Sequence, residues 1–382
     1  MPVFLPHRRL SAFVLYLGFA ATGVGLALPG SVLPALLHQW SLDDSQAGLL
    51  FLLGWLGSSI GALLVRGSII RSLSYGCLLL SFSAFGMAYA SRWTSFAWMA
   101  LFGIGLGMTM TGTSLVQASR NATRRGVELN RMNLVWSIGA ALCPLLAAHS
   151  LLVSNIRGIF SAVGIFFAIE FIWIALCEHD WPATAPVLAQ RSKWRLDLTL
   201  WPISLVILIM LPTGIESSIG GWAATYVQRT QEAIPATVTA GTCFWVGELV
   251  SRLLSSTFLL HRRSESFVLR LSLLCVATGA GALLTSQSPF VILPSVFLIG
   301  FGLGPVYPLL LAAAMQYSED SLIFFAAGVG SAALPWLTGV LSNAAGSLHT
   351  GLAVPLAGAL LMLTLGWRLA SPATAPQTQT HP

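Results

Sequence analysis

The sequence has few charged residues: Asp, Glu, Lys and Arg make up 8 % of 382 residues, against roughly a quarter in soluble domains. Hydrophobic residues make up 55 % of the chain, and the mean hydropathy is +0.79. This scarcity of charge excludes a soluble globular domain and indicates an integral membrane protein. The net charge of +6 is then explained by basic loops that face anionic lipid, and we expect no nucleic-acid partner.

Sequence signatures of metal, disulfide and nucleotide chemistry are also missing. The five cysteines lie in apolar runs without CxxC or Cys/His spacing, which argues against a disulfide framework and a metal site. Two glycine runs, at 103–107 and 300–304, have no strand before them and no Lys after them, so close helix packing explains them better than phosphate binding. No Ser/His/Asp constellation is evident. We therefore expect no cofactor, no metal and no enzymatic activity.

What the sequence does contain is an internal repeat. Gly-Ile-Gly-Leu-Gly at 103–107 returns as Gly-Phe-Gly-Leu-Gly at 300–304, and Gly-Ala-Ala-Leu-Cys-Pro at 139–144 returns as Gly-Ser-Ala-Ala-Leu-Pro at 330–335. The offsets, 300 − 103 = 197 and 330 − 139 = 191, are about half of the chain. Two similar membrane bundles in tandem are typical of secondary transporters.

Long apolar runs predict an all-helical protein with twelve transmembrane helices. Each run approaches the length of about 20 residues that a helix needs to cross a bilayer, and no alternating barrel pattern occurs. The predicted spans are 10–37, 46–65, 73–91, 94–119, 130–153, 156–177, 198–227, 235–260, 266–286, 289–316, 321–346 and 349–369. They form an N-terminal six-helix bundle (1–177), a cytoplasmic linker (178–197), a C-terminal six-helix bundle (198–370) and a disordered cytoplasmic tail (371–382).

Basic residues predict the orientation. With the N-terminus inside, 15 of the 19 Lys and Arg residues fall on the cytoplasmic side, whereas Arg92, Arg157 and Arg229 fall outside and Arg252 lies within a span. This bias predicts a multi-pass protein with both termini in the cytoplasm, most simply in a bacterial inner membrane. The first span lacks a signal-peptide cleavage site, and we expect it to be retained.

Four segments carry a family resemblance. They are Asn133 followed by Gly139 and Pro144; Glu216-x-x-x-Gly220-x-Trp222-x-x-x-Tyr226; Trp245-x-Gly247 leading to Arg252; and Gly330 through Pro335 to Gly339. With the twelve spans, they resemble the major facilitator superfamily and, within it, the fucose/galactose/glucose proton symporters. The resemblance implies a monomer with the major facilitator fold that carries a small neutral solute, a hexose or related sugar, together with protons by alternating access.

Two departures limit what the resemblance implies. The superfamily's loop after the second span usually carries an Asp shortly after a Gly, whereas Gly61 is followed here by Ala62, Leu63, Leu64, Val65 and Arg66. Fucose permeases also carry carboxylates in spans one and four, yet 10–37 and 94–119 contain no acid. Fucose itself therefore cannot be carried over to this chain.

Ionisable residues inside the spans are functional candidates, because a charge at membrane depth is costly. They are Glu170, Glu216, Glu248 and Arg252. Glu216 follows Pro212 and Gly214, which we expect to break the helix beside the carboxylate. It is a candidate for proton coupling and for substrate binding, although a structural acid paired with another span is the alternative. Glu170 lies in a span that is usually peripheral in this superfamily, where a lateral helix contact is as plausible as a role in coupling.

Span eight places Trp245, Glu248 and Arg252 on one helical face at spacings of three and four. Glu248 and Arg252 can pair within the helix, which lowers the cost of burying either charge. The alternatives are that they gate the cytoplasmic side as the bundles rock, or that Glu248 carries the proton.

Further candidates for substrate binding are aromatic and amide residues. Trp222 and Tyr226 could bind a sugar, or form an interfacial aromatic belt. Asn133 and Trp136 share one face of span five, where an amide suits a hydroxylated ligand but equally serves to join helices. The remaining candidates are Trp245, Gln117, Tyr307 and Asn343.

The sequence leaves three functions open. The first is a proton-coupled sugar transporter. The second is a proton-driven exporter of amphiphilic drugs or metabolites, which a lone acid in a large apolar cavity would also serve. The third is a membrane sensor or scaffold that transports nothing.

Overall fold

The computed structural model describes residues 11–120, 125–177, 203–230, 236–259, 262–285, 287–315 and 322–369. The predicted linker (178–197) and tail (371–382) lie outside these residues. The first six helices are α1 (Ala12–Trp40), α2 (Asp44–Leu64), α3 (Ile69–Ala88), α4 (Thr94–Arg120), α5 (Arg125–Val153) and α6 (Asn155–Cys177). They are followed by α7 (Ile203–Thr230), α8 (Ala236–Leu254) with a π-helical turn η3 (Ser255–Leu259), α10 (Glu265–Leu283), α11 (Pro289–Met315), α12 (Leu322–Ala345), the short α13 (Leu348–Gly351) and α14 (Ala353–Leu369).

The described part of the chain is helical, without strands. Eleven stretches in it are long and apolar enough to cross a membrane, and α8 is the remaining long helix. Each predicted span corresponds to a helix whose ends lie within a few residues of the prediction, because the apolar runs stop at polar caps such as Ser68, Asp43 and Ser264. The predicted all-helical membrane fold is confirmed.

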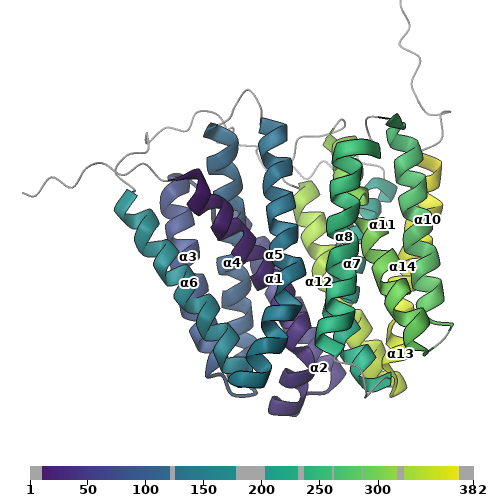
Figure 1. The fold of residues 1–382 in the computed structure, drawn as a ribbon, viewed down its shortest axis with the longest axis horizontal. Coiled ribbons are helices and arrows are strands. Elements are labelled where there is room, and N and C mark those ends of the chain that lie inside the picture. Colours follow the sequence, from purple (N-terminus) through teal and green to yellow (C-terminus); the bar gives the residue numbers. More distant parts are fainter. Residues whose placement is uncertain are drawn as a thin grey trace, which may run out of the picture.

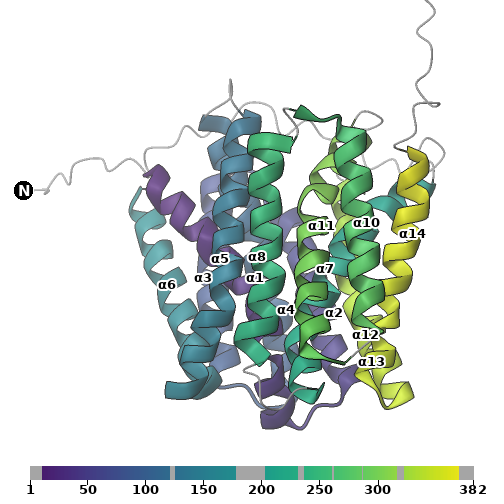
Figure 2. The ribbon, with the colours of Figure 1, turned by 45° about the vertical axis from the view of Figure 1, so that its right-hand side comes forward.

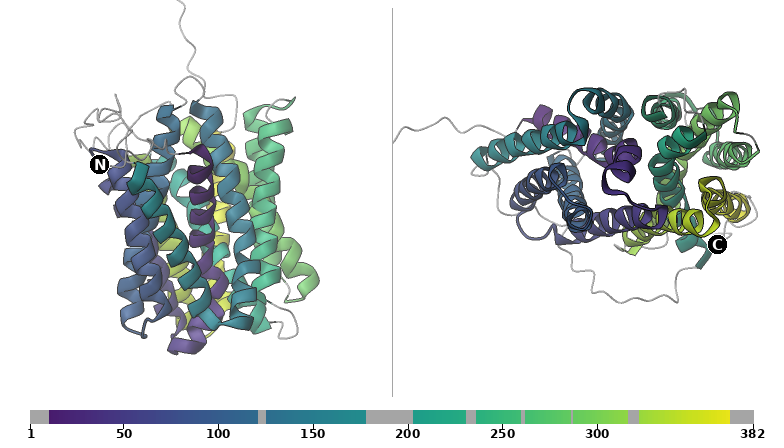
Figure 3. Two further views of the ribbon diagram at one scale, coloured as in Figure 1. Left: turned by 60° about the vertical axis from the view of Figure 1, so that its left-hand side comes forward. Right: turned by 90° about the horizontal axis from the view of Figure 1, so that it is seen from below.

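Helices α1–α6 lie together on one side of the molecule and α7–α14 on the other, as the purple-to-teal and green-to-yellow ribbons of Figure 1 and the end view of Figure 3 show. We call these groups the first and second halves. Contacts between the halves are made mainly by α2 with α12, α5 with α8, and α1 with α7. The helices run between two ends, called here the Ala12 face, where α1 begins, and the Trp40 face, where α1 ends (Figure 2).

The two glycine runs perform the same packing task in the two halves. A Cβ on Gly103 or Gly107 of α4 would collide with the backbone of α2, and one on Gly300 of α11 would collide with the backbone of α8. Likewise, Gly139 of α5 packs on α1 and Gly330 of α12 packs on α7. Each repeated glycine thus lets two helices of one half approach closely, as predicted.

Candidate transport cavity and its closures

A cavity lies midway along the helices, between the two halves. It holds about 590 Å³ of empty space, including the part that is open to solvent. Its wall is mostly apolar and aromatic. The lining residues are Gly25, Leu26, Ala27, Pro29 and Gly30 of α1; Leu50, Phe51, Gly54, Trp55 and Ser58 of α2; Met99, Phe102, Gly103 and Leu106 of α4; Glu216, Ser217, Gly220 and Gly221 of α7; and Trp245 of α8.

Glu216 is the one ionisable side chain in this described lining, and it is half-buried. The expectation of a broken helix beside it is wrong, since α7 is helical from Ile203 to Thr230 with Pro212 inside it. Neighbouring groups support the helix there: Thr213 Oγ1 donates to Ala327 O of α12 at 2.8 Å, and Ser217 Oγ donates to Thr213 O at 2.6 Å. Such contacts let a transmembrane helix tolerate proline. The acid is therefore presented by a rigid helix.

The predicted pair within α8 is present. Glu248, with its side chain only 1 % exposed, forms an ion pair with Arg252 one turn further on. Arg252 Nη1 also donates to Ser137 Oγ of α5 at 2.7 Å, and its guanidinium lies 5.3 Å from the centre of the Trp136 ring. Arg252 thereby links the two halves.

Glu216 interacts electrostatically with both Glu248 and Arg252. These three side chains, called here the charged triad, combine two acids with one base. Removal of a proton from one acid therefore changes the field at the other two groups, since charges interact strongly in apolar surroundings.

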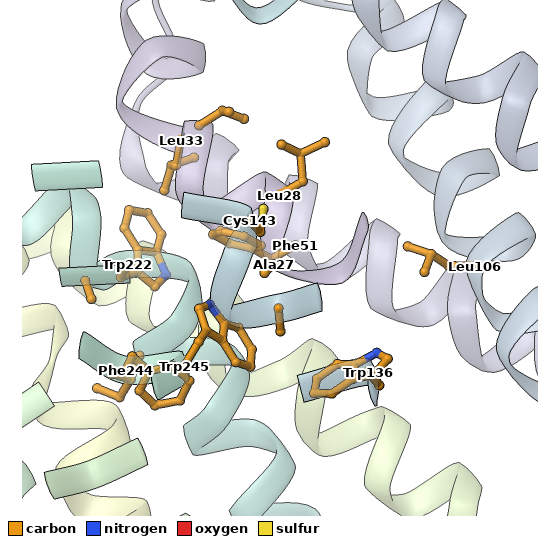
Figure 4. Close-up of a cluster of buried hydrophobic side chains, with 14 of the residues drawn as sticks. Ala27, Leu28, Leu33, Phe51, Leu106, Trp136, Cys143, Trp222, Phe244 and Trp245 are labelled. Atoms are coloured by element: carbon orange, nitrogen blue, oxygen red, sulfur yellow. The ribbon is translucent and has the colours of Figure 1, made fainter. Parts of the chain in front are cut away.

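Two tryptophans meet at the α5–α8 contact beside the cavity. Trp136 and Trp245 meet edge to face with ring centres 5.9 Å apart, and Figure 4 shows them beside Phe51, Phe244 and Trp222. Within the described structure, neither buried indole N–H has a hydrogen-bond partner. Of the two rings, only Trp245 is part of the cavity lining.

Trp222 and Tyr226 are absent from the cavity lining. Both are almost fully buried. Trp222 Nε1 donates to Pro335 O of α12 at 3.0 Å, and the Tyr226 hydroxyl and His349 Nδ1 of α13 are 2.8 Å apart. These contacts join helices of the second half, so the structure supports neither the aromatic belt nor direct contact with substrate in this cavity.

Five other predicted substrate ligands are also absent from the lining. Asn133 and Asn343 are exposed, Gln117 and Trp136 are buried, and Tyr307 is half-buried close to Glu216. Of the nine predicted ligands, the cavity therefore brings together Glu216 and Trp245.

A polar cluster lies at the Trp40 face, and it was not predicted from the sequence. Arg229 of α7 donates from Nη1 and Nη2 to the two carboxylate oxygens of Asp44 of α2, at 2.8 and 2.7 Å, and Ser342 of α12 donates to the same carboxylate. We call these three residues the latch. Beneath them, Gly30 packs on the backbone of α7 and Gly48 on that of α12. The partners of the ion pair are 185 residues apart, so no local pattern in the sequence signals them.

The corresponding cluster toward the Ala12 face stays within the first half. Tyr16 of α1 donates to Glu128 of α5, which also pairs with Arg131 at 3.0 Å. Among the described residues, the ion pair that crosses between the halves is the one in the latch. The latch therefore joins the two halves at the Trp40 face.

Residues 15–322 match the sequence profile of the Major Facilitator Superfamily. The chain belongs to this superfamily. A structure of the nucleoside transporter NupG is similar with a TM-score of 0.67 and 13 % identity, over 93 % of this chain and 96 % of that one. A bacterial homologue of the human lysosomal transporter Spinster, in an inward-facing and occupied conformation, is similar with a TM-score of 0.64 and 14 % identity, over 94 % and 95 %.

Synaptic vesicle glycoprotein 2A of Rattus norvegicus and of Homo sapiens are each 31 % identical over 142 residues, which cover 35 % of this superfamily member and 19 % of the relative. The chain thus matches about a fifth of the length of these relatives. Membership of the superfamily and the eleven described stretches that could cross a membrane identify a multi-pass membrane protein of a transporter family, not an enzyme.

Proposed function

We propose that this protein is a secondary active transporter that carries a small organic solute through the central cavity and couples its movement to protons. The observation that carries the proposal is Glu216, a single carboxylate in an apolar cavity, within electrostatic reach of the Glu248–Arg252 pair. Buried acids in transporters are typically proton or substrate sites.

The proposed movement is a rocking of residues 1–177 against 198–370, as a monomer. The distribution of basic residues supports a cytoplasmic Ala12 face, with both termini inside and the cell inner membrane as the location. The latch then closes the outer side. Release of the latch would open the cavity outward. In the alternate state the latch would stay closed, and the α5–α8 and α2–α12 contacts would part at the inner side instead.

Arg252 provides a route from proton binding to this movement. With Glu216 protonated, the guanidinium balances Glu248 and holds Ser137 of the opposite half. Once Glu216 loses its proton, two carboxylates compete for one guanidinium, and the contact with Ser137 is weakened. Proton release would thus loosen the α5–α8 contact and favour movement of the halves.

The cavity wall supports an amphiphilic solute better than a hexose. Aromatic faces from Phe51, Trp55 and Phe102 suit an apolar body, and Glu216 suits a basic or hydrogen-bonding group. A hexose needs many polar partners, and here the Ser217 hydroxyl already donates to the backbone. The unpartnered N–H of Trp245 beside the acid keeps a sugar as the second candidate.

The test is transport by purified protein in proteoliposomes with an imposed pH gradient. Labelled hexoses and labelled amphiphilic amines would be compared between wild type, Glu216→Gln and Glu265→Gln, whose acid is exposed at the start of α10. We expect Glu216→Gln to bind and exchange substrate without accumulating it, and Glu265→Gln to behave as wild type. Accumulation of substrate by Glu216→Gln at the wild-type level would remove Glu216 from coupling, and failure of wild type to move any solute would favour a sensor or scaffold.

A further inference from the structure

We propose that Glu170 of α6 is a second proton-binding site, placed outside the cavity and occupied by a proton whenever α1 packs against it. Its side chain points into the first half against Gly18 of α1, which is a contact between neighbouring helices, and the residue is 4 % exposed. Its neighbours Ile169 and Ile172 on α6 face outward instead.

Among the described residues, the carboxylate of Glu170 has no counter-charge. Both of its oxygens are buried without a hydrogen-bond partner in the described structure. An isolated carboxylate in apolar surroundings costs far more than its neutral acid, so the group is neutral in this conformation. The neutral carboxyl group of Glu170 therefore holds a proton, and this proton is separate from the one proposed for Glu216 in the cavity.

Charged and titratable groups on the packed helices do not alter this conclusion. The helices packed on α6 are α3, α5 and α1. From α3, buried Cys77 faces Glu170 closely enough to interact with it. From α1 the facing residue is Gly18, while Tyr16 of α1 and Arg131 of α5 are both engaged with Glu128. On α6 itself, the Arg157 guanidinium lies at the opposite end, over the Tyr89 ring.

Burial of the Glu170 carboxyl group depends on the position of α1, because it lies against Gly18 of that helix. A Cβ at this position would occupy the space of the Glu170 carboxylate, so the absence of a side chain creates the space for the acid. The same helix lines the transport cavity about two turns further on, at Gly25 and Leu26. A displacement of α1 that reshapes the cavity would therefore also uncover Glu170 and release its proton.

Infrared spectroscopy tests the occupancy directly. At neutral pH, the carbonyl-stretch band of a protonated acid should be present in wild type and missing from Glu170→Gln, which preserves shape. Glu170→Asp should keep a shifted band, which guards against a misfolded Gln variant. Identical spectra for wild type and Glu170→Gln would overturn the proposal. The readout needs no transported solute, so it stands or fails separately from the proposed transport function.

The link to α1 is tested with two further variants. Gly18→Ala should shift the Glu170 band, whereas Gly281→Ala of α10, where an added Cβ meets open space, should leave it unchanged. Arg229→Met, which releases the latch, should speed the shift of the band in D₂O by several fold, because α1 leaves Glu170 more often. An unaltered exchange rate in Arg229→Met would show that the site is not linked to the movement of the halves.

Discussion

Removal of one charge from the latch should open the Trp40 face. In Asp44→Asn or Arg229→Met, the ion pair between α2 and α7 is lost, whereas the N-cap of α2 at Asp43 is kept. Hydrogen bonds to charged groups contribute about 1.5–3 kcal/mol when buried, and exposed pairs contribute about 0–1 kcal/mol. The Arg229 side chain is 42 % exposed, so we expect an intermediate loss of about 1–2 kcal/mol, which corresponds to about a 5–30-fold larger fraction of molecules open at this face.

The assay is the labelling rate of a cysteine placed in the cavity, Ser58→Cys, by a membrane-impermeant maleimide added at the Trp40 face. The rate should rise about 5–30-fold in either latch variant. The combined variant should show little further increase, because the pair is already broken. Asp43→Asn is the matched control, since Asp43 is the acid next to Asp44 and its side chain caps α2 by accepting from Gln46 N. Unchanged labelling in the single variants, or fully additive effects in the combined one, would refute the closing role of the latch.

Three further predictions concern the charged triad, the tryptophans and the glycines. Arg252→Met should lower stability by about 3–5 kcal/mol because it leaves Glu248 buried and unpaired; thermal unfolding should show partial recovery when Glu248→Gln is added, and additive losses would mean that the two do not pair. Trp245→Phe should weaken binding of a ligand that carries a hydrogen-bond acceptor about tenfold, near the cost of one such bond. Trp222→Phe should lower the melting temperature and leave the affinity unchanged. Equal losses of affinity in the two variants would contradict these assignments. Gly103→Ala should cost about 1–3 kcal/mol of stability through overpacking against α2, and a melting temperature equal to wild type would show that α2 and α4 can separate freely.

The fold was predictable because the bilayer imposes a strong and local constraint. Each span needs an apolar run of fixed length, and polar caps mark where it stops, so the starts of helices such as α2 and α10 follow from composition. The repeat of the glycine runs further indicated which helices pack closely. The predicted break at Pro212 failed because Thr213 and its contact with Ala327 support the helix, and this contact joins residues 114 positions apart.

The site was only partly predictable for the same reason. Glu216 could be found because a lone acid in an apolar run is conspicuous, and Trp245 because it shares a face with two charged residues. Trp222 and Tyr226 were misleading, since their partners Pro335 and His349 come from later helices. Residue type and spacing indicate which face of a helix a side chain occupies. They do not indicate whether another helix covers that face.

Backbone-to-backbone packing at the repeated glycines determines where the molecule can deform. A helix pair that meets through side chains can change rotamers and absorb strain, whereas one that meets at Gly103 and Gly54, or at Gly330 and Met210, has little volume to rearrange. Each half should then be stiff along its glycine-packed helix pairs. Movement should be concentrated at the contacts between the halves and at helix contacts made through side chains, such as that of α1 with Glu170 of α6. Substitutions at these glycines should therefore reduce the amount of folded protein. Substitutions at the contacts between the two halves should instead change the transport rate of protein that is fully folded.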